Sequence, residues 1–148
     1  MKKYLHSKKG VSLIEVITVI AIIGILSGVS VAGYFYYKKN SELALNVQQT
    51  ANMIRKAKDN AVAVASDSQW GVNIESSKVT VFKGGSFSGR DTSFDEVVTI
   101  NGVTGVSGTT QIIFTKFTGL PPAASSVTLA SGPENKSIQI NEAGTVSY

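Results

Sequence analysis

The chain has 148 residues, no cysteine, a single histidine and a formal net charge of +4 at neutral pH. Because that histidine, His6, lies in the first ten residues, residues 11–148 offer no histidine or cysteine for a catalytic triad, a dyad or a zinc site. Enzymes built on those side chains are therefore excluded, and a folded domain has to be held together without disulfides.

The basic excess is confined to the N-terminus. The first ten residues hold four of the fourteen basic side chains and none of the ten acidic ones, which leaves ten of each sign in the rest of the chain. A balanced chain gives no indication of a nucleic-acid partner, because phosphate contacts by Lys and Arg supply most of that affinity.

An uncharged run of apolar residues extends from residue 16 to residue 37. As a helix rising ~1.5 Å per residue it reaches about 33 Å, enough to cross a hydrocarbon core ~30 Å thick. Four lysines precede the run and only Lys38 and Lys39 follow closely, which predicts a cytoplasmic N-terminus and an external C-terminal domain. Aromatic side chains at residues 34–37 are typical of the far membrane interface.

Glu15 is an acidic residue at the entry to this span, where a lone carboxylate costs ~2.5 kcal/mol or more. If the chain is cut between Gly10 and Val11, the new α-amine of Val11 is a cation that Glu15 could pair with, in a neighbouring copy or in its own chain. The alternative is a carboxylate that is protonated or that reaches toward the headgroups.

An ordinary secretory signal is a second interpretation of the N-terminus. Ser30-Val31-Ala32 supplies the small residues that precede such a cut, with Gly33 as the new first residue. An apolar signal segment is ~7 to 15 residues long, however, whereas this one continues past the cut into the aromatic residues. The length disfavours a secreted binding protein made from this signal.

The run from Lys8 to Leu26 resembles the leader junction and first half-helix of type IV prepilins and type II secretion pseudopilins. The resemblance rests on a basic leader that ends in Gly10, on Glu15 five residues later, and on an uninterrupted apolar helix. It implies that a prepilin peptidase cleaves after Gly10 and N-methylates Val11, and that Glu15 sets the register of assembly into a filament. Val11 stands where the family usually has phenylalanine, and no proline interrupts the span.

The same resemblance implies a location and a set of partners. The protein is expected to be a single-pass protein of the inner membrane that then enters a pilus or pseudopilus, with other pilin subunits, the assembly machinery and the bilayer as partners. Small residues on the span offer a face for close helix packing. They are Ala21, Gly24, Gly28 and Ala32.

An amphipathic helix is predicted for residues 41–66, with no glycine or proline to separate it from the span. Its stripe is formed by Leu43, Val47, Thr50, Ile54, Ala57, Ala61 and Ala65. Its opposite side is formed by Glu42, Asn46, Gln49, Arg55, Lys56, Asp59 and Asn60.

Residues beyond 66 have the two-residue alternation and turn signals of strands. Strands are predicted at 70–74, 78–83, 96–100, 111–115, 126–130, 137–141 and 145–148, with a glycine-rich loop at 83–93 and a tight turn at Asn101-Gly102. The prediction is an α+β fold with a long N-terminal helix packed on a mainly antiparallel sheet. Its parts are a leader (1–10), a membrane or filament-core helix (11–37), an amphipathic half (38–66) and a β-rich domain (67–148).

The β-rich part also resembles, more loosely, the globular domain of GspH/FimT-type minor pseudopilins. The matching segments are Trp70 to Ile74, Ile112 to Phe114 with Gly119 to Pro121, and Ile138 to Asn141 with Gly144 to Val146. The resemblance implies a minor or tip-associated subunit.

The function predicted from the sequence is structural and not enzymatic, with no cofactor. Asp91, Asp95 and Glu96 form one acidic cluster, for which a solvated loop is favoured over a calcium site. A DNA-capturing minor pilin is the alternative of another class. It is disfavoured because basic and acidic side chains balance after residue 10 and because the basic residues Lys78, Lys83, Arg90, Lys116 and Lys136 are scattered.

Overall fold

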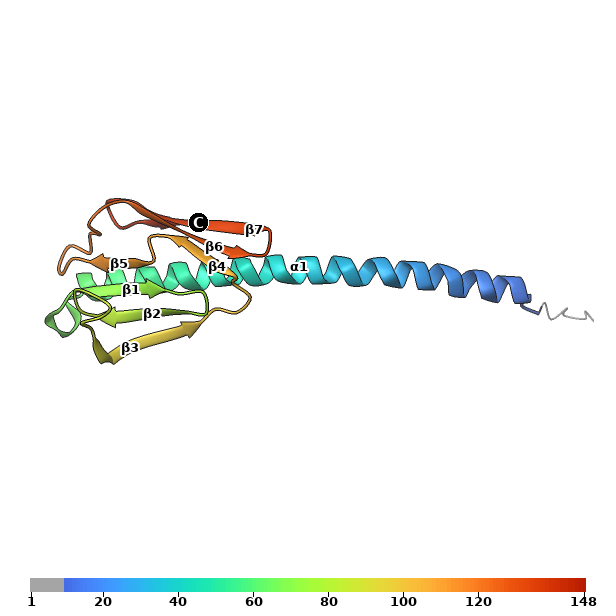
Figure 1. The fold of residues 1–148 in the computed structure, drawn as a ribbon, viewed down its shortest axis with the longest axis horizontal. Coiled ribbons are helices and arrows are strands. Elements are labelled where there is room, and N and C mark those ends of the chain that lie inside the picture. The colour runs from blue at the N-terminus through green and yellow to red at the C-terminus, as the bar shows by residue number, and fades with distance from the viewer. Residues whose placement is uncertain (1–9) are drawn as a thin grey trace, which may run out of the picture. The chain divides into compact units, whose positions relative to one another are not determined.

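The computed structural model describes residues 10–148, except for the side chains of residues 29–32. Figure 1 shows one long helix followed by short strands. The chain divides into two compact units, Met1–Tyr37 and Lys38–Tyr148, which are described separately below. The elements are α1 (Leu13–Val62), η1 (Ala65–Asp67), β1 (Trp70–Ile74), β2 (Lys78–Lys83), β3 (Asp91–Thr99), β4 (Gly105–Gly108), β5 (Gln111–Phe114), β6 (Ser125–Ser131), β7 (Glu134–Ile140) and β8 (Val146–Ser147).

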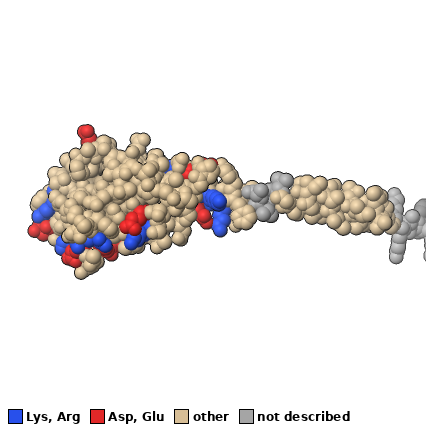
Figure 2. Space-filling model, in the orientation of Figure 1, with Lys and Arg blue, Asp and Glu red and all other residues tan. Residues whose placement is uncertain are grey.

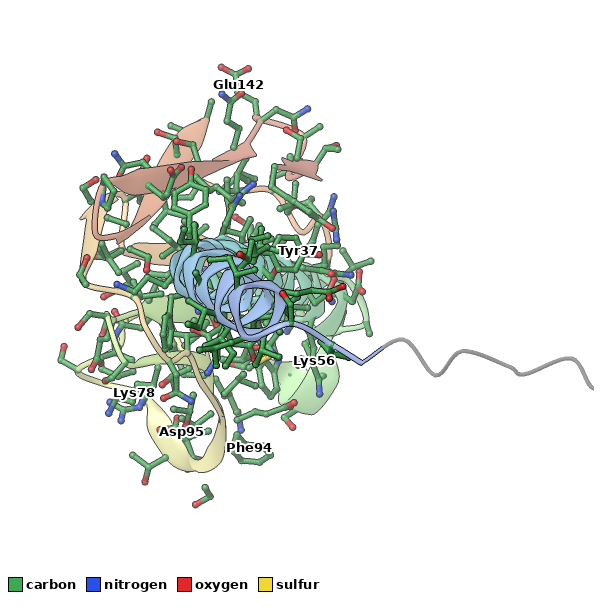
Figure 3. All side chains as sticks on the ribbon, turned by 90° about the vertical axis from the view of Figure 1, so that its right-hand side faces the viewer. Tyr37, Lys56, Lys78, Phe94, Asp95 and Glu142 are labelled. Carbon is green, nitrogen blue, oxygen red and sulfur yellow. The ribbon has the colours of Figure 1, made fainter. Side chains whose placement is uncertain are left out.

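The part of α1 from residue 38 onward buries the predicted stripe. Leu43, Val47 and Ile54 are at most 2% exposed and belong to one apolar core with residues of both sheets. Figure 3 looks along α1 and shows the helix between the two layers of strands. An apolar stripe that recurs every three or four residues forms this core because it keeps one side of the helix turned to its neighbours. The predicted apolar stripe is therefore buried from Leu43 to Ala61.

The helix ends four residues before the predicted end at residue 66. Val64 takes a left-handed backbone conformation with φ 54°, which few β-branched residues adopt. Two bonds from outside the helix hold the chain in this path: the Phe117 N–H donates to the Ala61 carbonyl at 3.1 Å, and Trp70 Nε1 donates to the Ala65 carbonyl at 2.8 Å. Tertiary hydrogen bonds thus replace the next helical turn.

The strands form two antiparallel sheets rather than one. The first sheet has the order β3-β2-β1-β5 and the second the order β4-β6-β7-β8. In the first sheet, Val72 lies opposite Val81 on one side and Ile112 on the other. In the second sheet, Val127 lies opposite Ile138. The α+β class and the antiparallel pairing are confirmed, and the division into two sheets is what the sequence did not reveal.

The connection from β3 to β4 explains that division. The prediction that Asn101-Gly102 makes a tight hairpin turn is wrong, since β3 belongs to the first sheet and β4 to the second. Gly102 does have the positive φ of 75° that the dipeptide favours, but it serves a crossover between layers. β3 begins at Asp91, inside the predicted loop, and β4 was not predicted because Gly105–Gly108 contains one apolar side chain.

Asn46 corrects a second prediction. It was placed on the polar side of the helix, yet it is only 8% exposed. Its Nδ2 donates to the Asn101 carbonyl at 2.7 Å, so this side chain fastens the crossover to α1. A buried carboxamide is accommodated there because its Nδ2 has a backbone acceptor.

Thr50 is a residue of the stripe whose hydroxyl is buried with no hydrogen-bond partner among residues 10–148. We expect Thr50→Val to raise the free energy of unfolding by about 1 kcal/mol. The change removes a buried hydroxyl that has no hydrogen-bond partner and keeps the shape of the side chain. Denaturant unfolding followed by the fluorescence of Trp70, the only tryptophan, measures the change. Thr50→Ser is the control: it keeps the hydroxyl, loses a methyl group, and should be about 1 kcal/mol less stable than wild type. A Thr50→Val protein that is less stable than wild type would contradict the assignment.

Candidate processing and assembly site

The predicted cleavage point lies just before the first turn of α1. Gly10 and Val11 are exposed and lie outside the helix. Ser12 is the N-cap, since its Oγ and its carbonyl both accept from the Glu15 N–H, at 3.3 and 3.1 Å. Ser12 and Glu15 have the spacing of a capping box, in which a serine caps the third residue of the helix. This local sequence therefore leaves the Gly10–Val11 peptide bond in accessible, non-helical chain. The basic leader, residues 1–9, lies outside the described residues.

Glu15 and Val11 share one face of the helix start. Both line a shallow surface groove of about 240 Å³, together with Val16, Val19 and Ile20. Within residues 10–148 no hydrogen bond or ion pair engages the exposed Glu15 carboxylate. The structure thus brings together the two predicted processing and register residues and leaves the acid available to a cation from elsewhere.

The apolar half of α1 is long and apolar enough to cross a membrane. Its described side chains do not contact a core: Ile20 is 64% exposed and Ile25 is 70% exposed. Two hydroxyl side chains along it are satisfied internally, because Thr18 Oγ1 donates to the Ile14 carbonyl and Ser27 Oγ to the Ile23 carbonyl, each at 2.7 Å. These hydrogen bonds to the helix backbone satisfy the two hydroxyl donors, for which lipid offers no acceptor.

The small-residue face is open where it is described. No heavy atom lies within 4 Å of a Cβ built on Gly24 or Gly28. Ala21 is likewise exposed, while the side chain of Ala32 lies outside the described part of the chain. This surface admits close approach of another helix backbone, which is the packing that small residues permit.

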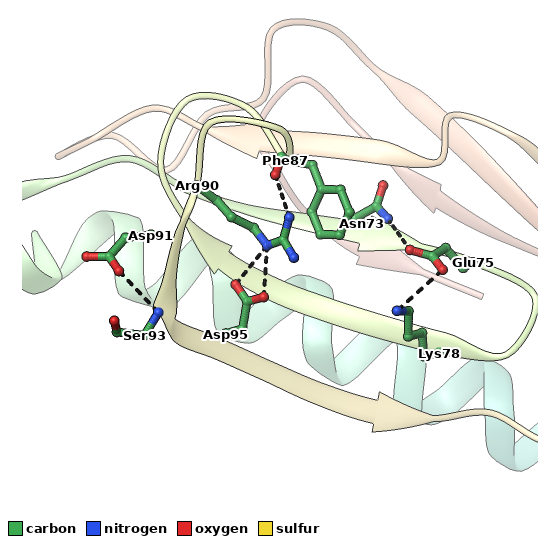
Figure 4. A network of polar contacts seen from close by, with 8 residues as sticks. All are labelled: Asn73, Glu75, Lys78, Phe87, Arg90, Asp91, Ser93 and Asp95. Carbon is green, nitrogen blue, oxygen red and sulfur yellow. Dashed lines mark hydrogen bonds and ion pairs between the residues drawn. The ribbon is translucent and has the colours of Figure 1, made fainter.

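A cluster that the sequence analysis missed covers the outer face of the first sheet. Arg90 lies over the Phe87 ring at 3.8 Å and donates through Nε to both carboxylate oxygens of Asp95, at 3.0 and 2.8 Å. Arg90 Nη1 also donates to the Phe87 carbonyl at 2.7 Å, as Figure 4 shows. Phe87 meets the fully buried Phe82 edge to face, with ring centroids 5.5 Å apart. The aromatic residue within the glycine-rich segment was the available signal that this loop is packed down rather than solvated.

The acidic residues of the calcium alternative do not converge. Asp95 is bound by Arg90, Glu96 accepts from Lys56 Nζ at 2.7 Å, and Asp91 accepts from the Ser93 N–H at 3.1 Å. Asp95 and Glu96 are adjacent on β3, so their side chains point to opposite faces of the sheet. Across residues 10–148, no group of three or more His, Cys, Asp or Glu side chains is arranged to hold a metal ion.

The basic side chains of the C-terminal unit are largely paired. Besides the two pairs just described, Lys58 Nζ donates to the carbonyls of Ala143 and Gly144 at 3.0 and 3.1 Å. Lys116 binds Asp67, and its hydrogen bond and charge hold the pKa of the Asp67 carboxyl below its usual value. Figure 2 accordingly shows blue and red side by side rather than a continuous basic surface. On the face shown, this pairing gives no indication of the continuous basic surface on which DNA capture depends.

Comparison with known families finds a match at the N-terminal end of the chain. The model for the prokaryotic N-terminal methylation motif matches residues 5–31, a range that contains Gly10, Val11 and Glu15. A search of curated proteins gives no match.

Two solved structures share the fold. The type IV minor pilin FimU of Pseudomonas aeruginosa aligns with 75% of this chain and 90% of its own, at a TM-score of 0.57 and 12% identity. The minor pseudopilin EpsH of the type 2 secretion system of Vibrio cholerae aligns with 72% of this chain and 94% of its own, at a TM-score of 0.52 and 15% identity. The chain thus carries the prepilin-type N-terminal methylation motif at residues 5–31, and it has the α+β fold of a minor pilin and a minor pseudopilin.

Proposed function

We propose that this chain is a structural subunit, a minor pilin or pseudopilin, of a type IV pilus or a type II secretion-type pseudopilus. The observation that carries the proposal is the match to the methylation motif over a helix whose apolar side chains are exposed. Apolar surface of that extent has to be covered by lipid or by other helices. The fold shared with a minor pilin and a minor pseudopilin supports the same conclusion.

The proposed mechanism follows from the helix start. A prepilin peptidase cuts after Gly10 and methylates Val11, and the protein remains in the inner membrane through the segment 11–37 with its domain outside. Assembly machinery then transfers the segment from lipid into a bundle of equivalent helices. The new amine of Val11 is offset by Glu15 of a neighbouring subunit, which fixes the axial register because a buried charge is costly unless paired.

The parts of the chain have separate roles in this proposal. Residues 1–10 are the leader, 11–37 the membrane and filament-core helix, 38–66 the amphipathic half, and 67–148 the β-rich domain that faces outward. The small residues Ala21, Gly24, Gly28 and Ala32 let neighbouring helix backbones approach closely.

Mass spectrometry of the protein purified from its native cells tests the proposal. We expect a chain that begins at methylated Val11, because the Gly10–Val11 bond is exposed and non-helical, follows the basic leader and lies within the residues that match the methylation motif. Cells that lack the prepilin peptidase are the control and should retain Met1. A native chain that begins at Gly33 would instead indicate an ordinary secretory signal, and one that keeps Met1 in peptidase-positive cells would indicate a simple membrane anchor. Either result would reject the assignment.

A further inference from the structure

A cleft lies on the second sheet, where β6 begins and β7 ends. Its volume is about 560 Å³, within the ~300 to 1,000 Å³ of small-molecule sites. Thr109, Ala124 and Ile140 form part of the wall. The remaining wall consists of hydroxyl and carboxamide side chains: Ser125, Ser126, Gln139, Asn141, Thr145 and Ser147. The lining contains no charged residue, so the cleft offers neutral hydrogen-bond donors and acceptors.

Part of this wall is held in position by the turn between β7 and β8. The Thr145 N–H donates to Asn141 Oδ1 at 2.8 Å, and the Asn141 N–H donates to the Thr145 carbonyl at 3.1 Å. The Asn141 carboxamide is therefore oriented before any ligand arrives, and its Nδ2 remains as a donor. Gln139 is exposed beside it. Positioned polar groups of this kind fix the orientation of a bound ligand.

A smaller apolar cavity of about 210 Å³ adjoins the cleft. The two share Thr109, Ala124 and Ser125, and the apolar cavity is lined further by Ile112, Ile113, Pro121 and Pro122 among others. The Ser125 hydroxyl at this junction is buried and has no hydrogen-bond partner among the described residues. A ligand group bound at the junction could therefore form the hydrogen bond that this buried hydroxyl lacks in the free protein.

The surroundings favour a neutral carbohydrate over the other ligand classes. The adjoining turn carries the exposed Glu142, labelled in Figure 3, and binds the Lys58 ammonium through its carbonyls, so it offers no net positive charge to attract an anion such as phosphate. The β7 backbone at the cleft is paired with β6 on one side and with β8 on the other, so an extended peptide finds no free edge on β7. Sugar hydroxyls both donate and accept, as do the side chains of the wall.

We propose that the cleft binds an N-acetylated amino sugar of a glycan chain. The ring hydroxyls occupy the polar cleft, and the methyl group of the acetamide enters the apolar cavity past Ser125. Two sources share this chemistry, namely chitin-type chains and bacterial cell-wall glycan. The site is separate from the N-terminal segment, so this inference does not depend on filament assembly.

Calorimetric titration of the full chain, in a detergent without a sugar headgroup, tests the ligand class. The probes are an N-acetylglucosamine trimer, the N-acetylglucosamine–N-acetylmuramic acid disaccharide with its lactyl carboxyl amidated so that it is neutral, and cellotriose, which lacks the acetamide. We expect at least one acetylated probe to bind at least fivefold more tightly than cellotriose. Whichever of the two acetylated probes binds more tightly indicates whether the natural ligand is a chitin-type chain or cell-wall glycan. No binding of either acetylated probe at millimolar concentration overturns the site, and equal binding of cellotriose overturns the acetamide assignment.

Variants locate the binding. Gln139→Ala should weaken the acetylated probe at least tenfold, and Ala124→Leu, which fills the shared wall, should abolish the preference over cellotriose. Both side chains are exposed, so neither change is expected to disturb folding. Ser107→Ala, an exposed position on β4 outside the cleft, is the matched control and should bind like wild type. Wild-type affinity in Gln139→Ala overturns the proposal. So does efficient cross-linking of a Gln139→Cys side chain to a neighbouring subunit, which would show that protein fills the cleft.

Discussion

Replacing Glu15 by leucine is expected to leave membrane insertion and cleavage intact and to lower incorporation into filaments at least tenfold. The carboxylate has no partner within residues 10–148, and it lies on the same face as Val11. In the proposed filament, removing it would leave the Val11 amine of a neighbouring subunit unpaired among the packed helices, and breaking a buried ion pair costs about 3–5 kcal/mol. That cost exceeds the ~1.4 kcal/mol that corresponds to a tenfold change. The helix start survives because Ser12 caps the backbone N–H of residue 15, whatever its side chain.

The measurement is the fraction of the protein in sheared filaments relative to membranes, with mass spectrometry confirming the cut before Val11. Glu42→Leu is the matched control, because Glu42 lies outside the uncharged run and forms an exposed pair with Lys38 at 3.7 Å. Such surface pairs contribute about 0–1 kcal/mol, so this variant should assemble normally. Wild-type amounts of Glu15→Leu protein in filaments would remove the assigned role of Glu15.

Replacing Gly108 by alanine is expected to lower the free energy of unfolding by about 3 kcal/mol or more. Gly108 has a φ of 89°, where a side chain strains the backbone by about 1–3 kcal/mol. An added Cβ would also lie 2.3 Å from the Ser126 carbonyl oxygen, so the pairing of β4 with β6 has to shift. Overpacking of this kind adds about 1–3 kcal/mol.

Gly105, at the other end of β4, provides the control. A Cβ there meets only the Ala130 side chain at 3.9 Å, which is ordinary contact. Gly105→Ala should therefore change stability by less than about 0.5 kcal/mol, as surface substitutions usually do. Denaturant unfolding of both variants gives the comparison, and equal stability of the two would show that β4 does not constrain Gly108 as described.

The strongest sequence predictions concern features that are continuous along the chain. The buried stripe of Leu43, Val47 and Ile54 was predictable because helical periodicity shows which side of a helix is buried, even when the element that it packs against is unknown. The arrangement of strands in two sheets was not, because strand alternation shows that a strand has a buried side but not which layer it joins. Asn46 was misplaced for the same reason: only the tertiary structure reveals that the Asn101 carbonyl faces it.

The candidate sites show the same division. The residues from Gly10 to Glu15 form a contiguous motif, so the sequence alone was enough to predict them as a candidate site, and their roles stay predictions. The Arg90–Asp95 pair was hidden because both residues were assigned to a solvated, acidic segment. The cleft was invisible because its walls come from residues between Thr109 and Ser147, and isolated serine, threonine and glutamine residues carry no pattern that sets them apart from ordinary surface.

The hydrogen bonds that Thr18 and Ser27 make within their own helix bear on whether the proposed move of this helix from lipid to filament is reversible. Each hydroxyl donates to a carbonyl one turn earlier in the same helix. Moving the helix from lipid into contact with other helices therefore neither breaks nor forms a hydrogen bond at these two positions. For the proposed subunit, growth and retraction of the fibre then differ mainly in van der Waals contact and in the pairing of Glu15. In the proposed filament, the segment would therefore leave or re-enter lipid with these two hydrogen bonds unchanged.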